Sequence, residues 1–210
     1  DAPDKPDTAK VRVADRLSRL TSPNIAFGFT EPPEQQMVLV QNATIWTCDE
    51  AGVLEEADML CRDGRIVAIG TGLEAPDNAL VIDATGMHLT PGVIDEHSHV
   101  AISGNVNEGT HAVTAEVRIG DVVDPADINV YRALAGGTTM ARLLHGSANP
   151  IGGQAQLVKF RWGGTAEAMK MTEAPASIKF ALGENVKQSN WGDNMTVRYP
   201  QTRMGVETIM

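Results

Sequence analysis

Short apolar runs separated by turn residues dominate the chain from Met37 to Gly92. Residues 37–47, 57–70 and 79–92 are rich in Val and Ile, as strands are. Asp63-Gly64 is a typical two-residue hairpin turn inside the second run. The pattern therefore predicts a small antiparallel β unit.

After Gly92 the pattern changes to strand, helix, strand. Residues 93–100 and 138–146 are apolar strands, and residues 124–137 form a helix between them. We expect Asp124 to be the helix N-cap, with Pro125 at the first helical position. This order predicts a parallel βα repeat. In the predicted helix of residues 124–137, Asp127 lies in the first turn, and Gly136-Gly137 ends the helix. Two further strands are predicted within residues 154–162 and 176–185.

Both ends of the chain differ from this pattern. Residues 1–35 are polar and carry several prolines, which favours an irregular arm with one short helix near residues 13–20. Residues 202–210 have the apolar spacing of a helix that has just begun. We therefore expect the chain to be a fragment or a cleaved subunit.

Charge and composition exclude several classes of partner. The formal net charge is −10, from 27 acidic and 17 basic residues, which argues against binding nucleic acid or an anionic membrane surface. A small neutral or cationic ligand fits better. No apolar run approaches the roughly 20 residues of a membrane span, so we expect a soluble protein, with secretion or periplasmic export after leader removal left open. The two cysteines, Cys48 and Cys61, do not form a disulfide framework.

His97 and His99 are the first candidates for chemistry. Side chains alternate along a strand, so the two imidazoles point to the same face and Ser98 to the other. Two neutral imidazoles at the C-terminal end of a buried parallel strand suit zinc or a similar divalent metal. The alternative is a pair of solvated polar residues at a strand end.

The residues around this pair resemble a known family. The matching elements are Val81-Ile82-Asp83-Ala84, Gly86, Pro91-Gly92, Ile94-Asp95 and His97-Ser98-His99. Together they resemble the passage by which the amidohydrolase superfamily leaves its β-sandwich and enters the first barrel strand. The resemblance covers about residues 37 to 190 and is closest to the imidazolonepropionase-like members.

The resemblance implies an α/β fold and three regions. Residues 1–35 would be the irregular arm, 36–91 the β-sandwich (composite) domain, and 92–210 the first strands and helices of a (β/α)8 TIM barrel that is incomplete in this chain. The barrel alone needs about 250 residues, and only about 120 follow the sandwich strands. We expect a second chain to carry the rest of the barrel, and the completed enzyme to be a homo-oligomer.

The family also implies a reaction. Its members bind one or two divalent metal ions, which activate water for attack on an amide or related C–N bond. For this chain, the resemblance implies that the metal is zinc. The substrate would be a cyclic amide, an N-acyl amino acid or a dipeptide. The family's catalytic aspartate is expected beyond residue 210, so no catalytic residue is assigned in this chain. The alternatives are a non-catalytic, partner-binding relic of the fold and a purely structural zinc site.

The resemblance points to further site residues. Lys179, as a carboxylated lysine, or Glu184 would supply the bridging carboxylate; their opposite strand parity leaves the choice open. His145 is expected at the barrel mouth, to bind substrate or a metal-linked water, or else to be bonded within its loop. His111, in the loop of residues 103–124, is a second substrate-binding candidate, with a plain surface role as the alternative. The remaining predictions are a structural His88, a barrel loop at residues 146–154, and substrate stacking or packing for Trp162 and Trp191.

Overall fold

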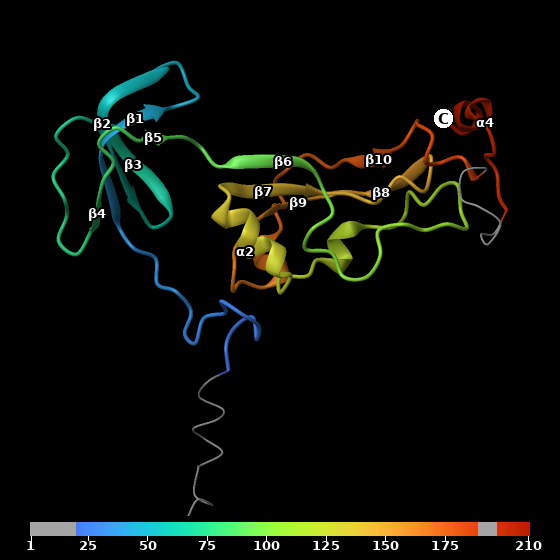
Figure 1. Cartoon of the computed structure of the whole chain (residues 1–210), viewed down its shortest axis with the longest axis horizontal. Helices are drawn as coiled ribbons and strands as arrows, with labels where there is room; N and C mark the ends of the chain where they lie inside the picture. The colour runs from blue at the N-terminus through green and yellow to red at the C-terminus, as the bar shows by residue number, and fades with distance from the viewer. Residues whose placement is uncertain (1–19, 189–196) are drawn as a thin grey trace, which may run out of the picture. The chain divides into compact units, whose positions relative to one another are not determined.

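The computed structural model describes residues 20–188 and 197–210 (Figure 1). The chain divides into two compact units: Pro33–Gly92, and Val93–Met210 together with the arm up to Pro32. Trp191 and nearly all of the helix predicted at residues 13–20 lie outside the described residues. In the part of the chain that the structure describes, every helix is too short or too polar to cross a bilayer.

The Pro33–Gly92 unit is a single five-stranded sheet. Its strand order is β3-β2-β1-β4, with β5 also paired to β1. The pairs β1–β2 and β2–β3 are antiparallel, whereas β4 and β5 run parallel to β1. The antiparallel prediction is therefore wrong for β4 and β5, because the connection after β3 carries the chain across to the far side of β1. The strands are β1 (Val38–Trp46), β2 (Val53–Arg62), β3 (Arg65–Gly70), β4 (Leu80–Asp83) and β5 (His88–Leu89).

The predicted hairpin turn is confirmed. Asp63 and Gly64 have φ angles of 52° and 69°, and they join Arg62 to its partner Arg65. Positive φ at both central residues is what a twisted two-residue hairpin needs. The described residues of this unit form one sheet, and the β-sandwich (composite) domain at residues 36–91 stays a prediction.

A buried carboxylate joins this sheet to its loop. Asp58, in β2, is 3% exposed and accepts hydrogen bonds from the backbone N–H groups of Asn42 (3.0 Å) and Leu73 (2.9 Å). Asn42 has a φ of 60° at an irregular point of the β1–β2 register. The hydrogen bond from Asn42, followed by that from Leu73, lowers the pKa of Asp58. The carboxylate therefore fixes both a strained strand residue and a loop.

Replacing Asp58 with asparagine is expected to lower the free energy of unfolding by about 1.5–3 kcal/mol at pH 7, the usual cost of losing hydrogen bonds to a charged group. The folded pKa lies below the unfolded value, so this stability is present above the unfolded pKa and is lost as pH falls through the folded pKa. Urea unfolding at neutral and acidic pH tests this. The exposed Asp77→Asn serves as control, and an equal effect of the two substitutions at pH 7 would contradict the prediction.

The second unit begins with the predicted parallel repeat. β6 (Val93–Ser98) and β7 (Thr138–Leu143) are parallel, with α2 (Ile128–Ala135) between them in the chain. The helix N-cap is Asp127 rather than Asp124: its Oδ1 accepts from Asn129 N, and its Oδ2 accepts from Ala101 N at 2.7 Å. Asp124 instead accepts from Ala126 N within the preceding turn. The predicted stop at Gly136 is confirmed.

The next strands depart from a simple barrel pattern. β9 (Gln156–Lys159) pairs antiparallel with β7, and β8 (Ile151–Gln154) pairs antiparallel with β10 (Ile178–Phe180). The extended segment 151–159 therefore links β7 to β10 (Figure 1). Strands were correctly predicted at β9 and β10, but the loop predicted for residues 146–154 is wrong from Ile151 onward. Among the described strands of this second unit, β6 and β7 are the parallel pair, and a complete barrel stays a proposal.

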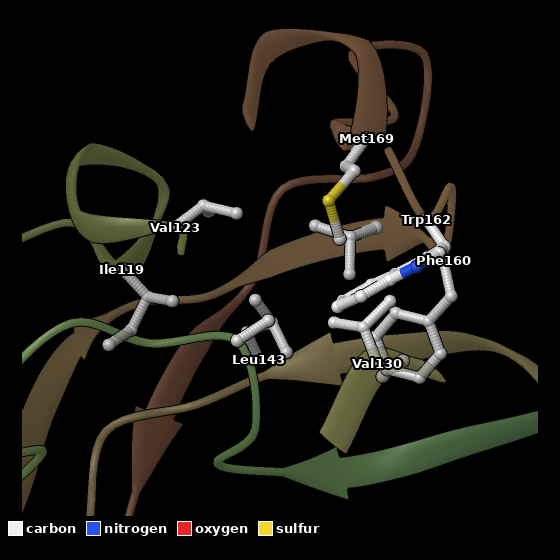
Figure 2. Packing of buried hydrophobic residues seen from close by; sticks show 10 residues of the cluster. Ile119, Val123, Val130, Leu143, Phe160, Trp162 and Met169 are labelled. Atoms are coloured by element: carbon white, nitrogen blue, oxygen red, sulfur yellow. The ribbon is translucent and has the colours of Figure 1, made fainter. Parts of the chain in front are cut away.

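An apolar core fills the space beside these strands (Figure 2). It gathers side chains from β7, α2, β9 and the short helices η2 (Ile119–Val122) and α3 (Ala166–Met169). Trp162 lies in this core, 8% exposed, and its indole N–H donates to Phe27 O at 2.7 Å. This position supports the packing alternative for Trp162. The helix predicted near the end of the chain is confirmed as α4 (Arg203–Ile209), capped by Thr202.

Candidate metal centre

His97, in β6, and His99, directly after the end of that strand, share one face, as predicted. Ser98 is buried at 5% exposure, whereas His97 and His99 on either side of it are exposed. The ring centroids of His97 and His99 are 5.2 Å apart, with the ring planes at 85°. The alternation of side chains along the strand therefore brings two imidazoles together at its C-terminal end.

The backbone of the neighbouring strand orients His99. Its Nδ1 lies 2.8 Å from the carbonyl oxygen of Leu144, which directly follows β7. A carbonyl can only accept, so this contact places the hydrogen on Nδ1 and leaves the lone pair of Nε2 free. A histidine in this state is ready to bind a metal through Nε2.

Lys179 brings an amine to the histidine pair. It is the middle residue of β10, 8% exposed, and its Nζ lies 3.1 Å from Nε2 of His97. Burial lowers the pKa of Lys179, which favours the neutral amine. Burial, and then the charge of Lys179, also lower the pKa of His97. Both groups are therefore held toward the uncharged forms that metal binding or carboxylation requires.

A cavity of about 320 Å³ opens beside these groups. His97, Lys179, Ser147 and residues 180–186 line it. Glu184 belongs to this lining, but its Oε2 lies 2.5 Å from Lys187 Nζ and its Oε1 lies 3.6 Å from Arg203 Nη1. Its carboxylate is therefore engaged in ion pairs, whereas the amine of Lys179 lies against His97.

His145 is buried rather than at the mouth of the cavity. It is 7% exposed, it is not among the residues that line the cavity, and its Nδ1 has no hydrogen-bond partner in the structure. Burial, and then the charges of His99 and Lys179, lower the pKa of His145. The buried ring thus lies close enough to His99 and Lys179 to feel their charges, and the lowered pKa favours its neutral form.

The other two histidines are held elsewhere. His111 is exposed in its loop, where its backbone N–H donates to Glu108 and its carbonyl accepts from Asn149. It does not line the cavity beside Lys179. His88 accepts a hydrogen bond at Nδ1 from Trp46 Nε1, at 3.0 Å, which agrees with a structural part. Across the described ranges, no three His, Cys, Asp or Glu side chains gather as a metal-binding group.

Sequence reasoning missed the glycine pair that supports the site. A Cβ added at Gly152 would lie 3.3 Å from Cβ and Cγ of Lys179, and one added at Gly153 would lie 2.2 Å from Cε1 of His145. Both glycines therefore let a site side chain lie directly against β8. The sequence shows the Gly-Gly dipeptide, but its glycine content predicts a loop there and not the strand β8.

Comparisons with known proteins agree with the motif. The amidohydrolase tasK of Hapsidospora irregularis is 34% identical over 200 residues, which cover 80% of this chain and 20% of that protein. The D-hydantoinase of Geobacillus stearothermophilus is 45% identical over 62 residues, 30% of this chain and 12% of that protein. No family model matches the chain.

A solved structure supports the same relationship. The crystal structure of an amidohydrolase from Thermotoga maritima superposes with a TM-score of 0.68 and 36% sequence identity, over 82% of this chain and 45% of that chain. The chain thus spans a fifth of the length of tasK and less than half of the Thermotoga protein. The likeness to imidazolonepropionase-like members stays a prediction. In its motif, its relatives and its structural likeness, the chain is similar to members of the amidohydrolase superfamily.

Proposed function

We propose that this chain is the N-terminal part of a metal-dependent hydrolase that uses water to cleave an amide or related C–N bond. The observation that carries the proposal is the 3.1 Å contact between His97 Nε2 and Lys179 Nζ, with the ring of His99 beside it. These three side chains come from the C-terminal end of β6 and from β10, which are distant in the sequence. Their convergence has no packing purpose, since His97 and His99 are exposed.

The donor set fits a divalent ion. Two imidazole nitrogens suit zinc, and a neutral buried amine can add to carbon dioxide, forming an N–C bond and releasing a proton to give a carbamate with two oxygen donors. Lys179 is favoured over Glu184 as the source of the bridging carboxylate, because Glu184 is paired with Lys187 and Arg203. We propose one or two zinc ions at His97, His99 and Lys179.

The reaction follows from these groups. A bound divalent ion would bring the pKa of a coordinated water towards about 7 and polarise the substrate carbonyl. The chain's own residues would hold and orient the site: Leu144 O keeps His99 in the Nδ1–H form, and the cavity receives the substrate beside Lys179. Its volume suits a small molecule. The names of three relatives, a D-hydantoinase, a dihydroorotase and an allantoinase, favour a cyclic amide over an N-acyl amino acid or dipeptide.

We further propose that the barrel is completed by sequence outside this chain. The expected aspartate would come from that part, whether it is a second chain or a continuation, and the completed enzyme would be a homo-oligomer. Apolar side chains on β6 and β10 are exposed and would be covered by the missing strands and helices. They are Val93 (59%), Ile94 (49%), Ile178 (37%) and Phe180 (50%).

Native and denaturing mass spectrometry with elemental metal analysis tests the proposal. We expect one or two zinc ions per completed assembly, together with a non-covalent second polypeptide or a longer chain that hydrolyses cyclic amides. A completed assembly that holds no metal and hydrolyses none of hydantoin, dihydroorotate or an N-acyl amino acid would overturn it. Such a result would favour the partner-binding alternative.

A further inference from the structure

We propose that His145 is a positioning residue: its buried ring holds in place the Leu144 carbonyl that orients His99. The inference rests on the proposed function, in which His99 is a metal ligand. It gives His145 a task different from contact with the substrate.

The N–H and the carbonyl of Leu144 are both hydrogen-bonded to the segment that carries the histidine pair. Its N–H donates to Ser98 O at 3.0 Å, and its carbonyl accepts from His99 Nδ1 at 2.8 Å. That carbonyl belongs to the planar peptide unit that joins Leu144 to His145. Any rotation of this unit moves the acceptor of His99 and the backbone of His145 together.

The ring of His145 is packed against the backbone of β8. A Cβ added at Gly153 would lie 2.2 Å from Cε1 and 2.7 Å from Nε2 of His145, so the ring occupies the space that a side chain at position 153 would fill. The following residue is also fixed, because Gly146 N donates to Val106 O at 2.8 Å. The ring of His145 is therefore held by packing against Gly153, and its backbone is held by the hydrogen bond of the next residue, Gly146.

Packing rather than hydrogen bonding of Nδ1 holds this ring. His145 is 7% exposed and its Nδ1 has no partner. A residue of similar volume without nitrogen should therefore hold the peptide unit as well as histidine does. A residue that leaves the space empty should release the Leu144 carbonyl, and the ring of His99 would then lose the acceptor that selects its tautomer.

The test compares His145→Ala with His145→Leu, which fills about the same volume. In the metal-free 210-residue chain, long-range ¹H–¹⁵N NMR should show His99 with hydrogen on Nδ1 in the wild type and in His145→Leu, and mixed tautomers in His145→Ala. Zinc affinity, measured by competition with a chelator in bicarbonate buffer, should fall about 10- to 100-fold in His145→Ala and less than about threefold in His145→Leu, by analogy with other residues that orient metal ligands. Circular dichroism confirms folding of each variant.

Two glycine variants approach the same contact from β8. Gly153→Ala should displace the His145 ring and disturb the His99 tautomer. Its Cβ would also lie 2.3 Å from the backbone oxygen of Val117, so circular dichroism must first show that this variant keeps the fold. Gly120→Ala is the matched control, because its Cβ would lie 2.7 Å from the flexible end of Gln156 and not near His145. If His145→Ala fails to fold, this pair decides the question.

Three results separate the inference from the proposed function. An unchanged His99 tautomer in folded His145→Ala, or in Gly153→Ala if the first variant does not fold, overturns the positioning role. His145→Leu binding zinc as weakly as His145→Ala also overturns it, since the nitrogen would then matter more than the volume. A wild-type chain that binds no zinc, yet whose His99 tautomer depends on His145, supports the positioning role and counts against the proposed metal site.

Discussion

Replacing Lys179 with methionine is expected to lower zinc affinity by more than about 100-fold, beyond the range seen when only a supporting residue of a metal ligand is lost. Methionine keeps the unbranched stem that packs beside Gly152 but removes the amine that lies 3.1 Å from His97 Nε2. The structure should therefore survive while the proposed carboxylate is lost. Chelator competition in bicarbonate buffer measures the affinity, and circular dichroism measures the fold.

The carbamate gives this prediction a specific signature. Removing carbon dioxide from the buffer should weaken zinc binding by the wild type and leave Lys179→Met unchanged, and ¹³C-bicarbonate should label the wild type but not Lys179→Met. Lys159→Met is the matched control, because Lys159 is exposed on β9. If Lys179→Met kept full zinc affinity and Glu184→Gln lost it, the bridging carboxylate would be that of Glu184.

The geometry of the histidine pair was predictable because it depends only on local structure. A strand has a period of two residues, so His97 and His99 share a face in any fold that keeps residues 97–99 extended. The exposure of both and the burial of Ser98 agree with this. The parallel pairing of β6 with β7 also followed from the strand, helix, strand order.

The choice between Lys179 and Glu184 depended on contacts that sequence order does not reveal. Strand parity indicated that the two would not both point inward without an irregularity, but it did not select one. The selection comes from Lys187 and Arg203, which lie against Glu184, and from the burial of Lys179. The Leu144 carbonyl was not predictable either, since every residue has a carbonyl and only the fold shows which one meets a ring.

β8 shows why a strand was predicted as a loop. Glycine has low strand propensity, so Gly152-Gly153 indicated a turn. In the structure, neighbouring backbones impose the extended form: Ile178 pairs with Gln154, and Thr114 N donates to Ile151 O at 3.0 Å. Because Gly152 and Gly153 have no side chains, they also leave room for Lys179 and His145. Tertiary pairing and site packing together override the local preference.

Replacing Trp162 with alanine is expected to lower the free energy of unfolding by about 3–5 kcal/mol, the usual cost of removing a large buried aromatic side chain. Trp162 is 8% exposed and its ring centroid lies 5.7 Å from that of Tyr131, which itself stacks on Phe27 at 4.5 Å. The substitution therefore leaves a cavity in the core and removes the donor to Phe27 O. Urea unfolding followed by circular dichroism measures the loss.

Two companion variants separate the contributions of packing and hydrogen bonding. Trp162→Phe keeps most of the apolar contact and loses the indole donor, so we expect a cost of about 1–2 kcal/mol. Trp46→Ala is the control, because Trp46 is 46% exposed, and it should cost less than about 1 kcal/mol. Hydrogen exchange of residues 21–29 should rise in Trp162→Ala more than in Trp162→Phe, since this part of the arm is held by the indole and by the rings around it. Equal costs for Trp162→Ala and Trp46→Ala would show that the arm and the core do not depend on this contact.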